Sequence, residues 1–224
     1  MPIFVEGSNP AVSEIIADVR ALLLDADKTR WDDDFLILAV NAAELEIVTL
    51  RPDAGVGLDT ILLEPGSEQS IDGFAVMDVV GQFAPDGATA ARIPTRLTTE
   101  QLNVMLPGRA THTPSATVVA WAYDTRDQGR FIVYPPQPAV DTGYLTVKQA
   151  SFPPGVTTAD DATFLPRDFK PQIVEYCLYH CFKRDAEYAD HAQRSAMHYQ
   201  QFLTLLGQSG DSAVRIAQRS EGAS

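Results

Sequence analysis

The sequence contains little cysteine and no long apolar run, and both deficits exclude classes of protein. Its 224 residues include two cysteines, Cys177 and Cys181, four residues apart in a helical pattern, a spacing rarely suited to a disulfide. No segment approaches the roughly 18 apolar residues of a membrane-spanning helix, and the N-terminal MPIFVEGSNP lacks the regions of a signal peptide. We therefore expect reduced cysteines, no membrane partner and a folded product in the cytoplasm of the cell that makes it.

Basic residues are also scarce, and the deficit is confined to one part of the chain. The net charge is -13, and residues 1–90 hold 17 acidic and 4 basic residues, whereas residues 91–224 hold 13 of each. Because direct binding to a nucleic-acid duplex needs a basic face, this composition argues against tight binding of nucleic acid. It suits a surface that DNA slides past, a surface that docks on a basic partner, or an acidic face that only aids solubility.

Catalytic motifs are missing from the sequence. It has no Gly-x-Ser-x-Gly, no Gly-Lys-Ser/Thr and no His-Glu-x-x-His motif. One helical segment carries a set of metal-ligand residue types: Cys177, His180, Cys181, Asp185, Glu187 and His191. Structural zinc sites usually take ligands from two elements, so we interpret the cysteines as small buried apolar residues. We predict no enzyme, no cofactor and no metal, and a metal-dependent hydrolase is the alternative that this segment leaves open.

Apolar residues at helical spacing predict three helical segments. The first covers residues 10–24, with Ser8 or Asn9 as its cap and Pro10 at the first helical position, and the second follows the cap Asp32 and ends near residue 51. The third covers residues 165–206 as one long helix or two nearly collinear helices, with Asp168 as a cap and Gly207 as its end. We predict that the long helix completes an antiparallel bundle with the N-terminal hairpin.

The segment between the helices has the period and the turn residues of β structure. Strands are predicted at residues 60–63, 74–80, 117–123, 130–134 and 144–149, with a short helix at 98–106. Asp127–Gly129 is the predicted tip of the hairpin between the third and fourth strands. The expected fold class is therefore α+β, with a helical hairpin at 1–52, an inserted antiparallel β region at 53–163, the long helix at 164–206 and an extended tail at 207–224.

The tail is polar and rich in glycine, so we expect it not to fold alone. It is either disordered or an arm that becomes ordered on a neighbouring protein. In an added strand, Val214 and Ile216 would alternate to one side, and Arg215 and Arg219 would meet acidic groups of the partner.

Several segments, in the right order over residues 11–207, resemble the head-to-tail adaptor proteins of short-tailed bacteriophages, a group that includes tail tubular protein A. Each motif is structural rather than catalytic, and the set carries the resemblance. The segments are Trp31-Asp32-Asp33, Asn41-Ala42-Ala43, Arg51-Pro52-Asp53-Ala54, LLEPGSEQS at 62–70, RFIVYPPQP at 130–138 and LPRDFKPQIVEYCLYHCFKRDAEYADHAQRSAMHYQQFLTLLG at 165–207.

The resemblance implies a non-enzymatic virion protein at the head-tail junction. It implies a ring, typically of 12 copies, between the portal protein and the tail nozzle, with DNA passing through the lumen without specific binding. The portal would bind the tail residues Val214, Arg215, Ile216 and Arg219. The loop residues Asp127, Gln128 and Gly129 would face the tail nozzle. Another virion connector, such as a stopper or completion protein below the adaptor, is the alternative.

Overall fold

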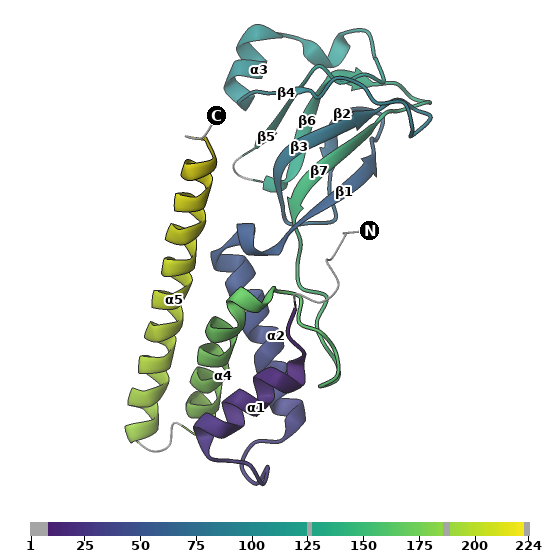
Figure 1. Ribbon diagram of the computed structural model, residues 1–224. Helices are drawn as coiled ribbons and strands as arrows, with labels where there is room; N and C mark the ends of the chain where they lie inside the picture. Colours follow the sequence, from purple (N-terminus) through teal and green to yellow (C-terminus); the bar gives the residue numbers. More distant parts are fainter. Residues whose placement is uncertain (1–8, 125–126, 186–188, 222–224) are drawn as a thin grey trace. The chain divides into compact units, whose positions relative to one another are not determined.

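The computed structural model describes residues 9–124, 127–185 and 189–221, and of residues 110, 124, 189 and 209–221 it describes the backbone alone. The contacts divide the chain into two compact units (Figure 1). Pro52–Phe152 form a β unit, and the described residues up to Arg51 and from Pro153 onward form a helical unit. The predicted α+β class is confirmed.

The helical unit contains α1 (Val12–Leu23), α2 (Asp33–Leu50), α4 (Lys170–Arg184) and α5 (Ala189–Glu221). As predicted, Asp32 caps α2, and its side chain accepts a hydrogen bond from the Phe35 N–H at 2.7 Å. The apolar faces of α1, α2 and α4 meet and bury residues such as Ile15, Ile47 and Cys177 completely. Helix α4 contacts each of the other three helices.

The start of α1 differs from its prediction. The N-cap is Ala11, and no side chain caps the helix. Instead, the free N–H groups of Val12 and Ser13 donate to the carbonyl oxygens of Asp161 and Ala159, at 2.9 and 2.8 Å. A segment about 150 residues away in the sequence therefore satisfies this helix end, and residues 153–163, which the composition grouped with the β region, pack with the helices.

The third helical segment is two helices that fold back on each other, so the prediction of one long helix or two collinear helices is wrong. Helix α4 ends at Arg184, and α5 returns alongside it (Figure 1). The physical reason is that Tyr176 and Phe202 lie on the apolar stripes of the two halves and are buried only when these halves pack together. Asp168 lies in a 3-10 turn (Arg167–Phe169), and the N-cap of α4 is Phe169.

Helix α5 does not end at Gly207. It continues through this residue to Glu221, so the predicted extended conformation of residues 207–224 is wrong for the described residues up to 221. Glycine lowers helix propensity by about 1 kcal/mol relative to alanine but does not forbid a helix. A start signal such as Asp32 is therefore more informative here than a single glycine near the expected end.

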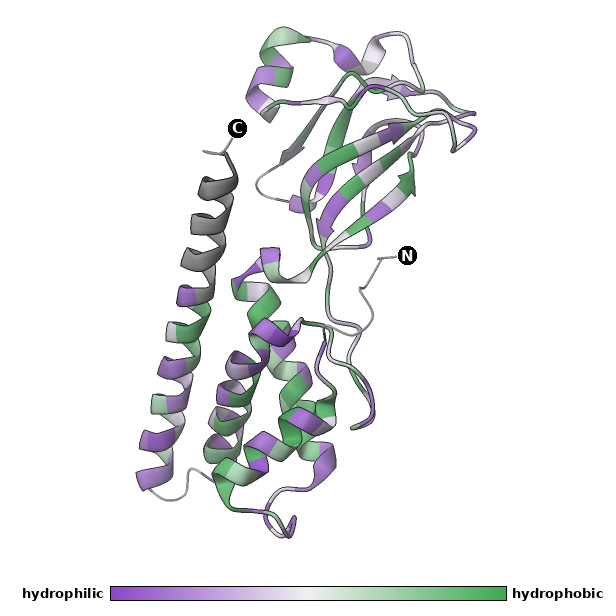
Figure 2. Ribbon diagram, in the orientation of Figure 1, coloured by the Kyte–Doolittle hydropathy of each residue, from purple (hydrophilic) through white to green (hydrophobic). Residues whose placement is uncertain are grey.

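The β unit is built from two sheets. One has the order β1-β7-β3, with β1 (Val56–Leu62), β3 (Ala75–Phe83) and β7 (Tyr144–Ala150) all antiparallel. The other has the order β2-β6-β5-β4, with β2 (Gly66–Ser70), β4 (Thr95–Arg96), β5 (Ala120–Asp124) and β6 (Asp127–Gln137). In this sheet β4 pairs with β5 in parallel, and the other two pairs of neighbouring strands are antiparallel. Strands of both sheets supply one core that includes Val79, Trp121, Phe131 and Val147. Hydrophobic and hydrophilic residues alternate along these strands (Figure 2).

The five predicted strands are present, with bounds shifted by a few residues. The structure adds β2 and β4, which the sequence analysis missed because the first has the polar sequence GSEQS and the second has two residues. The predicted short helix is α3 (Thr99–Met105). Thr98 caps it, and Gln101 bonds back to the Thr98 N–H in a capping box.

Candidate functional site

An aromatic seam fixes the first half of α5 to α4. The rings of Tyr176 and Phe202 have centroids 5.0 Å apart, and so do the rings of Tyr179 and Tyr199. Phe202 is fully buried, and burial raises the pKa of Tyr176 to about 12, so the Tyr176 hydroxyl stays protonated at physiological pH. We expect this half of α5 to be held firmly in place.

The seam ends at the last buried residue of α5 whose side chain is described, Leu206. Here the Gln172 Nε2 donates to the Leu205 carbonyl oxygen and the Arg51 Nη1 to the Leu206 carbonyl oxygen, both at 3.4 Å. Helix α5 has 33 residues against 15 in α4, and its residues 207–221 extend beyond this point for about 22 Å. We call residues 207–221 the C-terminal arm.

The C-terminal arm contains the predicted portal-binding residues Val214, Arg215, Ile216 and Arg219, whose side chains lie outside the described part of the structure. Its helical backbone changes their expected arrangement. Positions 214 and 216 are two residues apart and do not share a face of a helix, so the alternation expected of an added strand is wrong. Positions 215 and 219 are four residues apart and share one face, so the two arginines still form a pair.

The predicted tail-facing residues begin a strand rather than form a turn. Asp127, Gln128 and Gly129 are the first residues of β6, and Asp127 pairs with Asp124 across the hairpin. Residues 125–126, which connect the two strands in the sequence, lie outside the described residues. Asp127 and Gln128 are exposed, and the Asp127 carboxylate lies 3.4 Å from the Arg130 Nε.

The cysteine and histidine residues of α4 do not come together as a metal site. Cys177 and Cys181 are reduced and fully buried, as predicted, and burial raises the pKa of Cys177 far above its ordinary value and that of Cys181 to about 12. Asp185 instead forms an ion pair with Arg30 at 2.7 Å, and the His191 ring faces the Asp185 carbonyl oxygen at 3.2 Å. Glu187 lies outside the described residues. Among those described, no group of three or more potential ligands could hold a metal ion.

A buried polar cluster, which the sequence analysis missed, joins α1 to α2. The Arg20 guanidinium donates to the Asp25 carboxylate at 3.1 Å, to the Asp33 carboxylate at 2.7 Å and to the Trp31 carbonyl oxygen at 2.9 Å. The side chains of Arg20 and Asp25 are 8% and 5% exposed. The only signal in the sequence was an arginine within the apolar stripe of the first helix, beside Val19.

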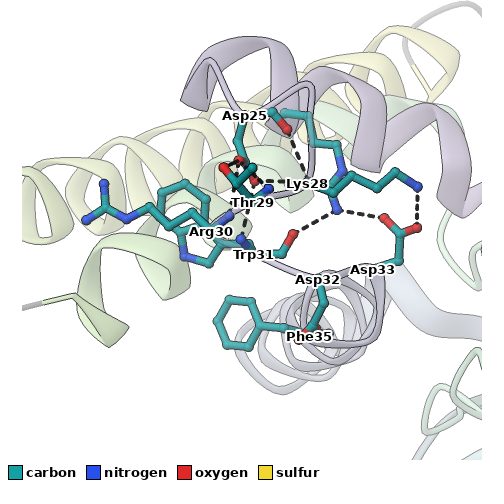
Figure 3. Close-up of polar contacts among 9 residues, drawn as sticks. Asp25, Lys28, Thr29, Arg30, Trp31, Asp32, Asp33 and Phe35 are labelled. Carbon is teal, nitrogen blue, oxygen red and sulfur yellow. Dashed lines mark hydrogen bonds and ion pairs between the residues drawn. The ribbon is translucent and has the colours of Figure 1, made fainter.

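Asp25 organises the loop between the two helices. Its carboxylate accepts hydrogen bonds from the N–H groups of Thr29, Arg30 and Trp31 and from the Thr29 hydroxyl (Figure 3). Burial opposes ionisation of this group, but these hydrogen bonds outweigh it and hold the pKa of Asp25 below its ordinary value. Lys28 bonds to Asp33 at 2.5 Å on the exposed side (Figure 3). The loop is therefore a fixed surface feature.

Glu44 of α2 is a fully buried acid that connects the helices to the segment before α4. Its Oε1 accepts a hydrogen bond from the Leu165 N–H at 3.0 Å. Burial raises the pKa of Glu44 to about 7, and the backbone N–H groups of Leu165 and Phe164 lower it. This carboxyl therefore titrates near neutral pH.

Comparison with known proteins identifies the family of the chain. Among the described residues, no helix combines the length and apolar character that a membrane span requires. No curated protein matches the sequence. The family model of the SU10 adaptor protein matches residues 10–222, nearly the whole chain. The chain therefore belongs to the SU10 adaptor protein family, and the predicted kinship with bacteriophage head-tail adaptors is confirmed.

Proposed function

We propose that this protein forms the adaptor ring between the portal and the tail nozzle, with its helical units side by side as a bundle in the ring. The observation that carries the proposal is the C-terminal arm, which extends α5 past its last described buried contact. Family membership supports the general role, a structural adaptor of the phage particle that interacts with portal and tail proteins.

The C-terminal arm has the properties of a segment that needs a partner. It contains Gly207, Gly210 and three serines, which are poor helix formers. Isolated helices of about 12–15 residues are marginal in water even with good helix formers. A binding surface on the portal would stabilise the arm, and the arginine pair at positions 215 and 219 would contact acidic groups there.

The acidic excess of the first 90 residues suits the wall of a DNA channel. Exposed carboxylates such as Asp27 in the loop between α1 and α2 and Asp34 on α2 belong to this excess. A lumen lined by carboxylates repels phosphates, so DNA would pass without binding. We place part of this acidic surface in the lumen and the β5–β6 hairpin, with Asp127 and Gln128, toward the tail nozzle.

Removing the C-terminal arm tests the portal contact. A chain truncated before Gly207 is expected to bind the portal of the same virus at least tenfold more weakly, because it loses the arm and keeps the seam of α4 and α5. Size-exclusion chromatography with light scattering, on mixtures and on each component alone, measures this binding. The full chain should co-elute with the portal at about one adaptor per portal subunit.

A pair of matched variants separates the arginines from general charge effects. Arg215→Glu with Arg219→Glu should weaken portal binding like the truncation. Arg130→Glu with Lys148→Glu makes the same change in charge at exposed positions of the β unit and should leave portal binding unchanged. If the truncated chain bound the portal like the full chain, the arm would have another role.

A further inference from the structure

The outer face of α5 carries almost no charge, although the protein is strongly acidic. No Asp, Glu, Lys or Arg occurs between Arg194 and Asp211. Met197 is 59% exposed and Leu203 36%. A helix face that stays in water normally carries charged residues, whereas the centre of a protein interface is depleted of them. The exposed residues of this outer face are Ala192, Gln193, Ala196, Met197, Gln200, Gln201, Leu203, Thr204, Gly207 and Gln208, with the exposed Arg194 at its edge.

A groove between α1 and α4 offers a complementary surface. It has a volume of about 440 Å³, and Leu22 in its wall is 62% exposed. Lys170 pairs with Asp18 at 2.8 Å beside the apolar part. The lining residues are Asp18, Ala21, Leu22, Lys170, Pro171, Val174 and Glu175. The groove is thus an apolar surface flanked by the carboxylates of Asp18 and Glu175 and by the ammonium group of Lys170.

The groove and the outer face of α5 are different surfaces of one helical unit. Helix α4 contacts both α1 and α5, and it lies between these two helices in Figure 1. A closed ring needs two different surfaces on each copy, because each subunit contacts its two neighbours in a head-to-tail manner. The helical unit therefore presents a pair of surfaces that a ring can use.

We propose that the outer face of α5 in one copy docks in the α1–α4 groove of the next copy, an inference that rests on the proposed ring. The charges favour a second copy as the occupant. Two chains of net charge -13 repel each other wherever their acidic surfaces meet, so contact is favoured where the charge is absent. Arg194, the cation beside the uncharged face, is opposite in charge to the carboxylates of Asp18 and Glu175 in the groove.

Cross-linking with a short bismaleimide tests this contact in the full chain. The native Cys177 and Cys181 are buried, so introduced cysteines can be targeted selectively. Leu22→Cys alone and Met197→Cys alone should give no cross-linked dimer, and an equimolar mixture of the two should give dimers. A chain carrying both substitutions should give a ladder up to the full ring, because every copy can link to both neighbours.

Two outcomes would overturn the proposal. Strong cross-linking of Met197→Cys to itself would indicate a two-fold contact between identical faces. No cross-linking in the mixture, at high protein concentration and with portal present, would show that the two surfaces do not meet. Cross-linking and portal binding are measured separately. If the mixture cross-links but the protein does not co-elute with the portal, the lateral contact between copies stands and only the proposed portal binding is overturned.

A charge variant gives an independent measurement. Met197→Glu should weaken self-association at least tenfold in sedimentation or light scattering, because it places a carboxylate in the contact. Leu38→Glu is the control, since Leu38 of α2 is 65% exposed and lies outside both surfaces. Equal effects of the two variants would contradict the assignment.

Discussion

Replacing Arg20 by alanine is expected to destabilise the helical unit by about 3–5 kcal/mol, the cost of removing one partner from a buried ion pair. Arg20 binds two carboxylates and the backbone carbonyl oxygens of Asp25 and Trp31 where its side chain is 8% exposed. Its removal leaves the Asp25 charge buried without its cation. The loop between α1 and α2 should loosen as well, because Asp25 and Asp33 lose their common partner.

Urea unfolding followed by circular dichroism at 222 nm measures this change in free energy of unfolding. Arg167→Ala is the matched control, because Arg167 also donates two hydrogen bonds to a carboxylate, Glu14, but its side chain is 54% exposed. Exposed ion pairs contribute about 0–1 kcal/mol, so this variant should be close to wild type. Similar losses of unfolding free energy in the two variants would show that burial does not determine how much the Arg20 cluster contributes to stability.

The pH dependence of stability should change when Glu44 is replaced by glutamine. Burial raises the pKa of Glu44 in the folded protein from 4.5 to about 7. Between these two values the folded state binds a proton that the unfolded state has lost, so the contribution of Glu44 is fully present below pH 4.5 and is lost as pH rises through about 7. The loss amounts to about 3 kcal/mol, from 1.36 kcal/mol per pKa unit.

Glutamine is neutral at every pH and keeps the oxygen that accepts the Leu165 N–H. The free energy of unfolding of Glu44→Gln minus that of wild type should therefore grow with pH from 4.5 to 8, by about 3 kcal/mol. Urea titrations at several pH values measure this difference, and the subtraction removes the effects of other carboxyls. Asp34→Asn controls for the loss of one exposed charge. Parallel profiles for Glu44→Gln and wild type would contradict the raised pKa.

Local signals in the sequence determined a large part of this protein. Asp32 identified a helix start because a cap and the N–H groups it binds lie within one turn of each other. Alternating residues identified five strands, and the apolar stripe of α4 predicted that Cys177 and Cys181 are buried. The ordered set of motifs also placed the chain among phage adaptors, a placement that the family match confirms.

Tertiary structure decided the features that depend on residues far apart in the chain. The start of α1 is satisfied by Asp161, and Leu165 reaches Glu44, contacts that no local pattern encodes. The return of α5 along α4 also depends on residues far apart in the chain. An apolar stripe shows that a helix needs a partner, but it does not show which segment is that partner. The sequence therefore determined the positions of most helices and strands, and packing decided where α4 and α5 separate, which faces the elements bury and which charges they enclose, such as that of Arg20.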